Sequence, residues 1–248
     1  MNLWQENMKF EYMKPKSLFK FIHYTFCFEH PFTCIISGPT MSGKSYFVNR
    51  LIKLSNKKIY PPPDEIHYHY GVWQPLFDSM KKKVLFFKGL PELSHFTGGK
   101  KILIIIDDLM SEINSEISDF FTKGAHHLNL SVVYICQNLF HKNQFQRTIN
   151  LNTQYLIIFK NPRDVCQIQY LGRSLLGNNA KEFEDIYFHA TSRSYGYLVV
   201  NLRQTTPDMY RFVTYILDDH PKSSAHYLHF DVYLLDRYID YNTQSIAQ

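Results

Sequence analysis

The sequence is poor in the residues that mark disulfide-stapled, zinc-binding or unstructured proteins. Its 248 residues include only four cysteines, none of them in a C-x-x-C pair (Cys27, Cys34, Cys136 and Cys166). We therefore expect buried free thiols in a reducing compartment rather than a disulfide framework or a metal site. Glycine and proline are also few, at 10 and 11 residues. Together with 45% hydrophobic residues, this low content of glycine and proline is typical of an ordered globular domain.

Long apolar runs are absent as well. No segment reaches the roughly 18 uninterrupted apolar residues of a membrane span, and residues 1–21 mix charges throughout, without the apolar centre of a signal peptide. We therefore expect a soluble, intracellular protein with no membrane partner. The net charge of +5 suits an anionic partner such as nucleic acid, but many unrelated enzymes are equally basic.

The length and the pattern of apolar runs predict one α/β domain. Short apolar runs predict buried strands at 32–37, 65–70, 84–88, 101–107, 131–137, 154–160 and 197–202, and helical spacing follows the first and fourth of them, at 47–54 and 109–121. Strands that are apolar on both faces and alternate with helices predict a mostly parallel central sheet flanked by helices, a three-layer fold. The expected division is an N-terminal lead-in (1–29), the α/β domain (30–215) and an aromatic tail (216–248).

A glycine-containing loop follows the first predicted strand. The segment "GPTMSGKS" matches G-x-x-x-x-G-K-[ST], with a strand before it and a helix after it. Its glycines allow a close backbone approach, and its N–H groups together with the helix start form a nest for anions. The predicted phosphate-binding residues are Gly38, Pro39, Thr40, Met41, Ser42, Gly43, Lys44 and Ser45. We expect Lys44 to contact the β- and γ-phosphates and Ser45 to ligate Mg²⁺; the competing interpretation is an ordinary glycine turn before a helix.

A pair of aspartates ends the apolar run "KILIIIDDLM". An ionised carboxylate is costly to bury there unless it is paired or close to a metal, and ligands of open α/β sheets bind at the carboxyl ends of strands. We therefore predict that Asp107 holds Mg²⁺, through water. Asp108 is the candidate for orienting or deprotonating an attacking water, or it caps the helix that follows.

Two further features favour an ATPase. The strands predicted at 65–70 and 84–88 separate the glycine loop from the aspartate pair, and we take this interval to place an extra strand between the two nucleotide-binding strands. No N-K-x-D segment, which would read guanine, is present, so ATP is favoured over GTP. Gln137 ends another apolar run and is either a sensor of the γ-phosphate or a polar strand end at the surface.

Together these segments resemble viral genome-packaging ATPases of the FtsK–HerA superfamily, most closely the poxvirus-like ATPases of Polinton/Maverick elements and related large DNA viruses. The resemblance covers residues 30 to 207 and is most specific from Lys123 to Asp164. It lies in "SGPTMSGKS", "YGVWQP", "IIIDDLM", "FTKGAHHLNLSVVYICQNLF" and "NLNTQYLIIFKNPRD". The family's second acidic residue is often Glu, whereas this chain has Asp108, which puts the role of that residue as a catalytic base in doubt.

The resemblance implies a P-loop fold of the RecA/FtsK type, with the additional catalytic strand, and a motor that hydrolyses ATP with Mg²⁺. It implies a homo-oligomeric ring, often a hexamer, that threads double-stranded DNA into a preformed capsid, with a capsid or portal protein as a further partner. It places the protein inside a host cell, in the nucleus or a cytoplasmic virus factory, or on the virion. Gln137 matches the family's glutamine after the fourth core strand, which supports its role as a sensor.

A ring motor also needs an arginine that completes the site of the neighbouring subunit. Arg163, in "KNPRD", is the first candidate and Arg147, in "FQRTINLN", is the second. The competing interpretation is that either arginine pairs with an acid such as Asp164.

Two other functions stay open on the sequence alone. One is a P-loop nucleotide or nucleoside kinase, against which the extra strand and the lack of an arginine-rich lid argue. The other is a slowly hydrolysing nucleotide-binding scaffold for virion assembly, which the intact loop and the aspartate pair disfavour.

Overall fold

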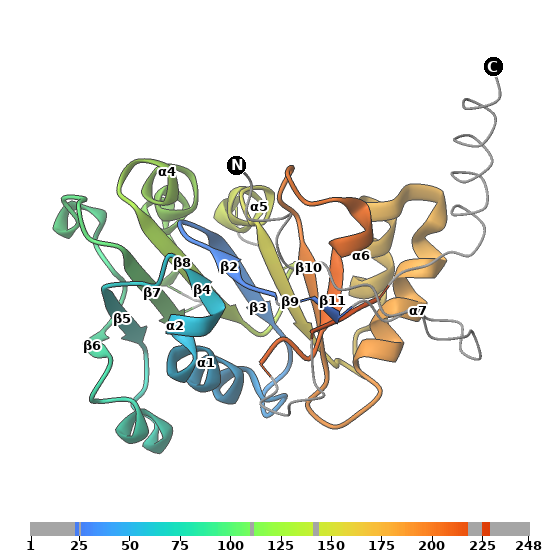
Figure 1. The fold of residues 1–248 in the computed structure, drawn as a ribbon, viewed down its shortest axis with the longest axis horizontal. Coiled ribbons are helices and arrows are strands. Elements are labelled where there is room, and N and C mark those ends of the chain that lie inside the picture. Colours follow the sequence, from blue (N-terminus) through green and yellow to red (C-terminus); the bar gives the residue numbers. More distant parts are fainter. Residues whose placement is uncertain (1–22, 25, 110–111, 141–143, 218–224, 229–248) are drawn as a thin grey trace.

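The computed structural model describes residues 23–24, 26–109, 112–140, 144–217 and 225–228. Within them, one large sheet is built from β1 (His23–Tyr24), β3 (Thr33–Ser37), β5 (Glu65–Tyr70), β6 (Leu85–Lys88), β7 (Ile102–Asp107), β8 (Leu130–Cys136), β9 (Tyr155–Phe159), β10 (Tyr197–Asn201), β11 (Phe212–Thr214) and β12 (Ala225–Tyr227). The order across the sheet is β1-β12-β11-β10-β9-β3-β8-β7-β5-β6 (Figure 1). Two short strands, β2 (Phe28–Glu29) and β4 (Ile59–Tyr60), form a separate parallel pair.

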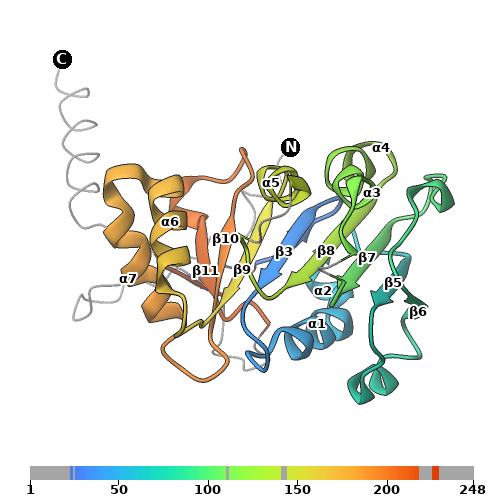
Figure 2. The same cartoon turned by 180° about the vertical axis from the view of Figure 1, so that it is seen from behind.

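Helices cover both faces of the sheet (Figures 1 and 2). They are α1 (Lys44–Lys53), α2 (Ser55–Lys58), α3 (Ser115–Asp119), the π-helix η4 (Phe120–Gly124), α4 (Ala125–His127), α5 (Gln144–Leu151), α6 (Val165–Leu176) and α7 (Ala180–Ala190), with 3₁₀ turns η1 (Pro75–Ser79), η2 (Leu93–His95), η5 (Gly177–Asn179) and η6 (Asp208–Tyr210). No helix in these described parts is both long and apolar enough to cross a bilayer.

The central strands are buried on both faces, which makes the fold three-layered. Along β7, Leu103 and Ile105 pack into a core with Leu51 of α1. The alternate residues Ile104 and Ile106 pack into a second core with Ile117 of α3, which also holds apolar residues of α5, α6 and α7. Successive side chains of a strand point to opposite faces, so a strand between two helical layers must be apolar throughout. The predicted α/β fold is confirmed.

Every strand expected from the apolar runs is present, with ends within one residue of the prediction. The six strands from β9 to β6 across the sheet run parallel. β10 is antiparallel to β9, and β11, β12 and β1 continue the antiparallel edge. The direction of β10 could not be predicted, because this strand is buried on both faces and such a strand is apolar whether it runs parallel or antiparallel.

An extra strand does lie between the two predicted nucleotide-binding strands, β3 and β7, but the interval from 65 to 88 does not supply it. The strands at 65–70 and 84–88, β5 and β6, lie beyond β7 at the edge of the sheet, and the strand between β3 and β7 is β8. After β3 the chain passes outward to β5 and β6, returns to β7, and only then adds β8 against β3. The order of strands along the chain does not fix their order in a parallel sheet, because crossover connections can skip a position.

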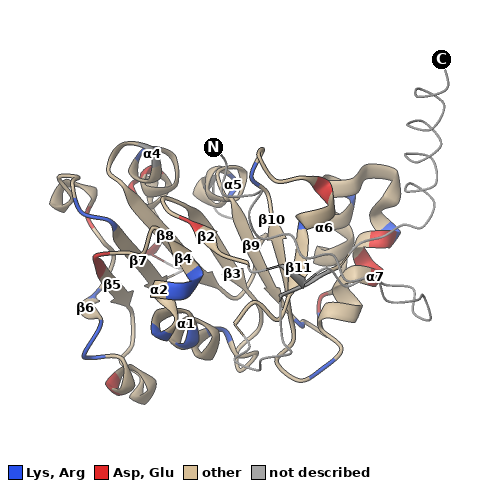
Figure 3. Ribbon diagram, viewed as in Figure 1, with Lys and Arg blue, Asp and Glu red and all other residues tan. Residues whose placement is uncertain are grey.

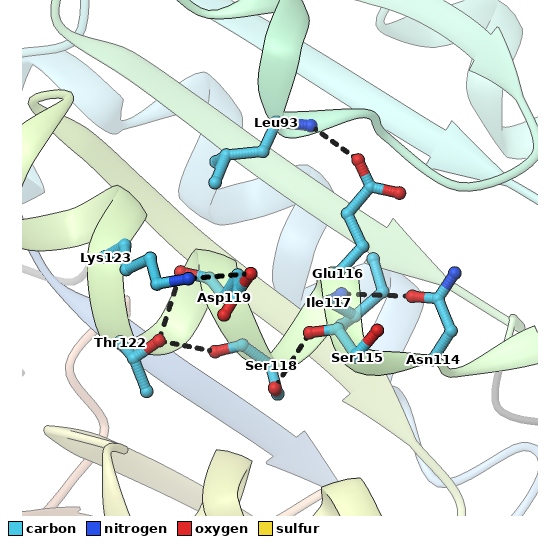
Figure 4. Close-up of polar contacts among 9 residues, drawn as sticks. All are labelled: Leu93, Asn114, Ser115, Glu116, Ile117, Ser118, Asp119, Thr122 and Lys123. Atoms are coloured by element: carbon cyan, nitrogen blue, oxygen red, sulfur yellow. Dashed lines mark hydrogen bonds and ion pairs between the residues drawn. The ribbon is translucent and has the colours of Figure 1, made fainter.

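The helix expected across 109–121 begins later than predicted, at Ser115. Figure 4 shows the reason: the Asn114 side chain accepts a hydrogen bond of 3.1 Å from the Ile117 N–H and so caps α3. The Glu116 carboxylate accepts a bond of 3.0 Å from the Leu93 N–H and ties the start of the helix to η2. Leu109 is buried although it precedes the helix. The helical spacing therefore reflected burial in this part, and Met110 lies outside the described residues.

The division into a lead-in, an ATPase domain and a tail stays a prediction. β1 and β12, one from each predicted terminal segment, pair with each other at the edge of the large sheet. Residues 1–22, 25, 218–224 and 229–248 lie outside the described part of the chain.

Candidate active site

A hollow of 540 Å³ lies where β7 and β8 end and α1 begins. Because β3, β7 and β8 are parallel, their carboxyl ends meet at one edge, the usual ligand-binding edge of such sheets. The lining residues are Thr40, Met41, Ser42, Gly43, Lys44, Ser45, Tyr46, Gln74, Asp107, Asp108, Ile135, Cys136 and Gln137. The structure thus brings most of the glycine loop together with both aspartates and Gln137, whereas Gly38 and Pro39 are not among the lining residues.

The backbone of the loop explains its two glycines. A Cβ on Gly38 would lie 2.7 Å from the Phe159 Cβ and 2.9 Å from the Ser42 Oγ, so a side chain there would displace the loop. Gly43 has φ of 103° and stands at the N-cap of α1, a conformation that side chains oppose. The first turn of α1 lines the hollow through Lys44, Ser45 and Tyr46. The first N–H groups of a helix have no partner within the helix, which makes a helix start suitable for binding anions.

The Lys44 side chain folds back along the loop. Its ammonium donates hydrogen bonds to the carbonyl oxygens of Gly38, at 2.5 Å, and Pro39, at 2.9 Å. Burial lowers the pKa of this ammonium, and the negative charges of Asp107 and Asp108 act in the opposite direction. A cation is thus fixed between the loop and the aspartate pair, where a phosphate group would meet it.

Asp107 is the buried carboxylate of the site, with only 5% of its surface exposed. The Tyr68 hydroxyl on β5 donates a hydrogen bond of 2.6 Å to its Oδ2. Burial raises the pKa of the Asp107 carboxyl, although the bond from Tyr68 lowers it. A carboxylate whose charge is this poorly solvated gains strongly from an adjacent cation.

Asp108 differs from Asp107 in exposure and in backbone. Its side chain is exposed, and its φ of 57° places it in the left-handed region, which non-glycine residues seldom adopt outside turns and functional sites. Asn114 caps α3, so the alternative role of Asp108 as the cap of that helix was wrong. A Cβ on Gly71 would lie 2.8 Å from the Asp108 carbonyl oxygen, which shows how closely the segment after β5 approaches the aspartate pair.

Two glutamines line the hollow. Gln137 follows β8 and is exposed, so it lies beside the space where a terminal phosphate would face Asp107. Gln74 was not predicted; it precedes η1 in the segment after β5. The sequence signal that could have identified it is its place shortly after the strand predicted at 65–70. That strand, β5, is parallel to β7, and the ends of parallel strands lie at one edge of the sheet. An amide there could hydrogen-bond water or phosphate.

Neither candidate arginine lines the hollow. Arg163 is exposed in the turn between β9 and α6, at the same edge of the sheet, and Arg147 is exposed on α5. The Asp164 carboxylate caps α6 by accepting a bond of 3.3 Å from the Gln167 N–H. Within the described residues neither arginine forms an ion pair, so the structure offers no support for the alternative in which one of them pairs with Asp164.

The residues of the hollow fit a magnesium–triphosphate. The glycine loop makes room for phosphates, Lys44 supplies a cation, and Ser45 and Asp107 supply oxygen ligands of the kind Mg²⁺ prefers. No group of three or more His, Cys, Asp or Glu side chains that could hold a metal is found in the described residues. A magnesium ion here would therefore depend on Ser45, Asp107 and phosphate oxygens together.

The bond between Tyr68 and Asp107 gives the first prediction. We expect Tyr68→Phe to raise the Mg²⁺ concentration needed for half-maximal nucleotide binding about tenfold, because Tyr68 lowers the pKa of Asp107 and orients its carboxylate, and loss of such a partner costs about 10- to 100-fold in metal affinity. Magnesium titrations followed with a fluorescent ATP analogue would measure the shift. Tyr134→Phe is the matched control, because that buried hydroxyl of β8 has no hydrogen-bond partner in the described residues. An unchanged magnesium requirement in Tyr68→Phe would contradict the assignment of Asp107.

Comparison with protein-family models and with curated proteins found no match for this chain. Among solved structures, the chain is similar to the genome packaging NTPase B204 from Sulfolobus turreted icosahedral virus 2 in complex with ATP-gammaS, at 14% identity over 71% of this chain and 94% of that chain, with a TM-score of 0.47. It is also similar to the flagellar accessory protein FlaH from Methanocaldococcus jannaschii, at 13% identity over 82% of this chain and 92% of that chain, with a TM-score of 0.41.

Proposed function

We propose that this chain is an ATP-driven DNA translocase that packages viral or virus-like double-stranded DNA into capsids. It would act as a homo-oligomeric ring with each ATP site shared between two subunits. The observation that supports ATP hydrolysis is that the glycine loop, Lys44 and Asp107 line one hollow. Gln137 lines the same hollow, at the end of β8, the strand between β3 and β7.

The chemistry follows from these positions. Lys44 and the N–H groups at the start of α1 would hold the β- and γ-phosphates in place. Ser45 and Asp107 would hold Mg²⁺, which when bound neutralises charge on the phosphate oxygens. Asp108, exposed beside Asp107, would orient the attacking water and accept its proton, and Gln137 would contact the terminal phosphate. Phosphoryl transfer needs mainly such positioning and charge stabilisation.

The DNA-packaging part of the proposal rests on the sequence resemblance between Lys123 and Asp164. A second, weaker support is the distribution of charge: Figure 3 shows Lys and Arg on α1 and α2, among them Lys53 and Lys57. Both lysine side chains are exposed, and exposed lysines can contact phosphates without regard to sequence.

ATP turnover with and without duplex DNA tests the proposal. We expect turnover that duplex DNA stimulates several-fold, because a motor couples hydrolysis to movement along its track, and we expect the stimulation to weaken as salt rises. Turnover that requires a nucleoside or nucleotide acceptor would instead identify a kinase. Slow turnover that responds to neither addition would identify a scaffold.

A further inference from the structure

A second hollow, of 260 Å³, adjoins the first on the other side of the glycine loop. Its lining residues are Gly43, Tyr46, Phe47, Arg50, Phe159, Arg193, Ser194, Tyr195, Tyr197 and Leu217. Gly43 and Tyr46 line both hollows. The first hollow lies over the ends of β7 and β8 and the second beside β9 and β10, so the two are on opposite sides of β3. A ligand that extends past the first turn of α1 would therefore pass from one hollow into the other.

The position of the carboxylate and amide groups in the first hollow determines which end of such a ligand lies there. Asp107, Asp108 and Gln137 stand at its far end, toward β7 and β8. The phosphate that accepts nucleophilic attack must lie near these groups, since they are the candidates for metal binding and for orienting water. The opposite end of the phosphate chain then leaves the loop at Gly43 and Tyr46, which is the boundary shared with the second hollow.

The walls of the second hollow suit a flat ring. Phe47 and Tyr197 meet edge to face at 4.9 Å between ring centroids, and Phe159 lies 5.5 Å from Tyr197, so three rings form a buried aromatic floor. At the rim, Tyr46 and Tyr195 are 61% and 70% exposed. The Tyr195 ring lies against Gly43, where an added Cβ would be 3.2 Å from its Cδ1. Exposed aromatic rings beside a hollow can stack on a nucleobase.

The charges of this hollow also suit a nucleotide. Among the residues that the structure describes, its lining contains two arginines, Arg50 and Arg193, and no aspartate or glutamate. The Arg193 guanidinium lies 3.5 Å from the centroid of the Tyr215 ring. This contact fixes one wall of the hollow.

From this arrangement we infer that the second hollow binds the base of the nucleoside triphosphate, with Tyr195 and Tyr46 stacking on it and a purine preferred over a pyrimidine. The inference rests on the proposed function, because it takes the first hollow as the triphosphate site. The purine preference follows from ring size, since a larger base covers more of the tyrosine rings and buries more apolar surface.

The test compares ligands that reach one hollow or both. Calorimetric titrations of the full chain with ATP, CTP and inorganic tripolyphosphate, each with Mg²⁺, would be run on wild type, Tyr195→Ala and Tyr46→Ala. In at least one variant we expect the affinity for ATP to fall about tenfold, the low end for loss of a base–aromatic stack, and the preference for ATP over CTP to shrink. Affinity for tripolyphosphate should stay within about twofold, because that ligand lacks a base. The matched control is Tyr170→Ala, whose side chain on α6 is 66% exposed outside both hollows.

Each alternative outcome is distinct. Unchanged affinity for ATP in both tyrosine variants would overturn the base site and leave the triphosphate site standing. Equal losses for ATP and tripolyphosphate would also overturn it, because the substitutions would then act through the loop. A wild-type protein that binds none of the three ligands would overturn the proposed function itself.

Discussion

Lys44→Ala is expected to abolish ATP turnover. The ammonium of Lys44 is held at 2.5 Å and 2.9 Å from the two loop carbonyls of Gly38 and Pro39, in the hollow that Asp107 also lines. No other lysine or arginine lines this hollow in the described residues. Its loss would therefore leave the charge that develops on the transferring phosphoryl group without its main protein cation. Loss of a single stabilising donor in an active site costs about 10²- to 10³-fold in rate, and we expect at least that reduction in a steady-state phosphate-release assay.

The control for Lys44→Ala is Lys181→Ala. Lys181 is 75% exposed on α7 and pairs with Asp185 on the surface, so its removal tests the loss of a positive charge away from the hollow and should leave turnover unchanged. Circular dichroism would confirm that both variants are folded. Hydrolysis at the wild-type rate by folded Lys44→Ala protein would remove the assignment of the glycine loop as the phosphate site.

Many of the residues that line this hollow could be predicted from the sequence, because they belong to local sequence patterns. The loop from Gly38 to Ser45 carries its own signal, since the strand, the glycines and the helix follow one another in the chain. Asp107 was also predictable, because a carboxylate directly after five apolar residues has few stable environments. The central strands β3, β8 and β9 were predicted to within a residue because they are buried on both faces, which favours apolar side chains throughout.

What could not be predicted depends on contacts between distant segments. Tyr68 lies within an apolar run, and nothing local indicates that its hydroxyl meets Asp107, 39 positions later. The placement of β8 between β3 and β7 depends on crossover connections, and the order of strands along the chain does not reveal it. Tyr195 resembles an ordinary turn residue until the fold brings its ring against Gly43. Each of these features requires the tertiary arrangement.

Arg163→Ala is expected to keep ATP binding and lose hydrolysis. Arg163 is exposed at the edge of the sheet that carries the hollow, yet it does not line the hollow of its own chain. In the proposed ring, an arginine in that position would act on a neighbouring subunit, where it would stabilise the charge of the transition state. Such residues raise the rate about 10³- to 10⁵-fold. Nucleotide affinity should change little, because the loop, Lys44 and Asp107 of the same chain stay intact.

Mixing two inactive variants would show whether the arginine acts between subunits. In a ring that joins Arg163→Ala and Lys44→Ala subunits, some interfaces combine an intact phosphate loop from one variant with an intact arginine from the other. Random mixing in equal amounts gives this combination at roughly a quarter of head-to-tail interfaces, so partial turnover should return. Arg147→Ala in place of Arg163→Ala tests the second candidate by the same mixture. If both variants assemble with Lys44→Ala subunits and neither mixture regains activity, the arginine finger does not come from these two positions.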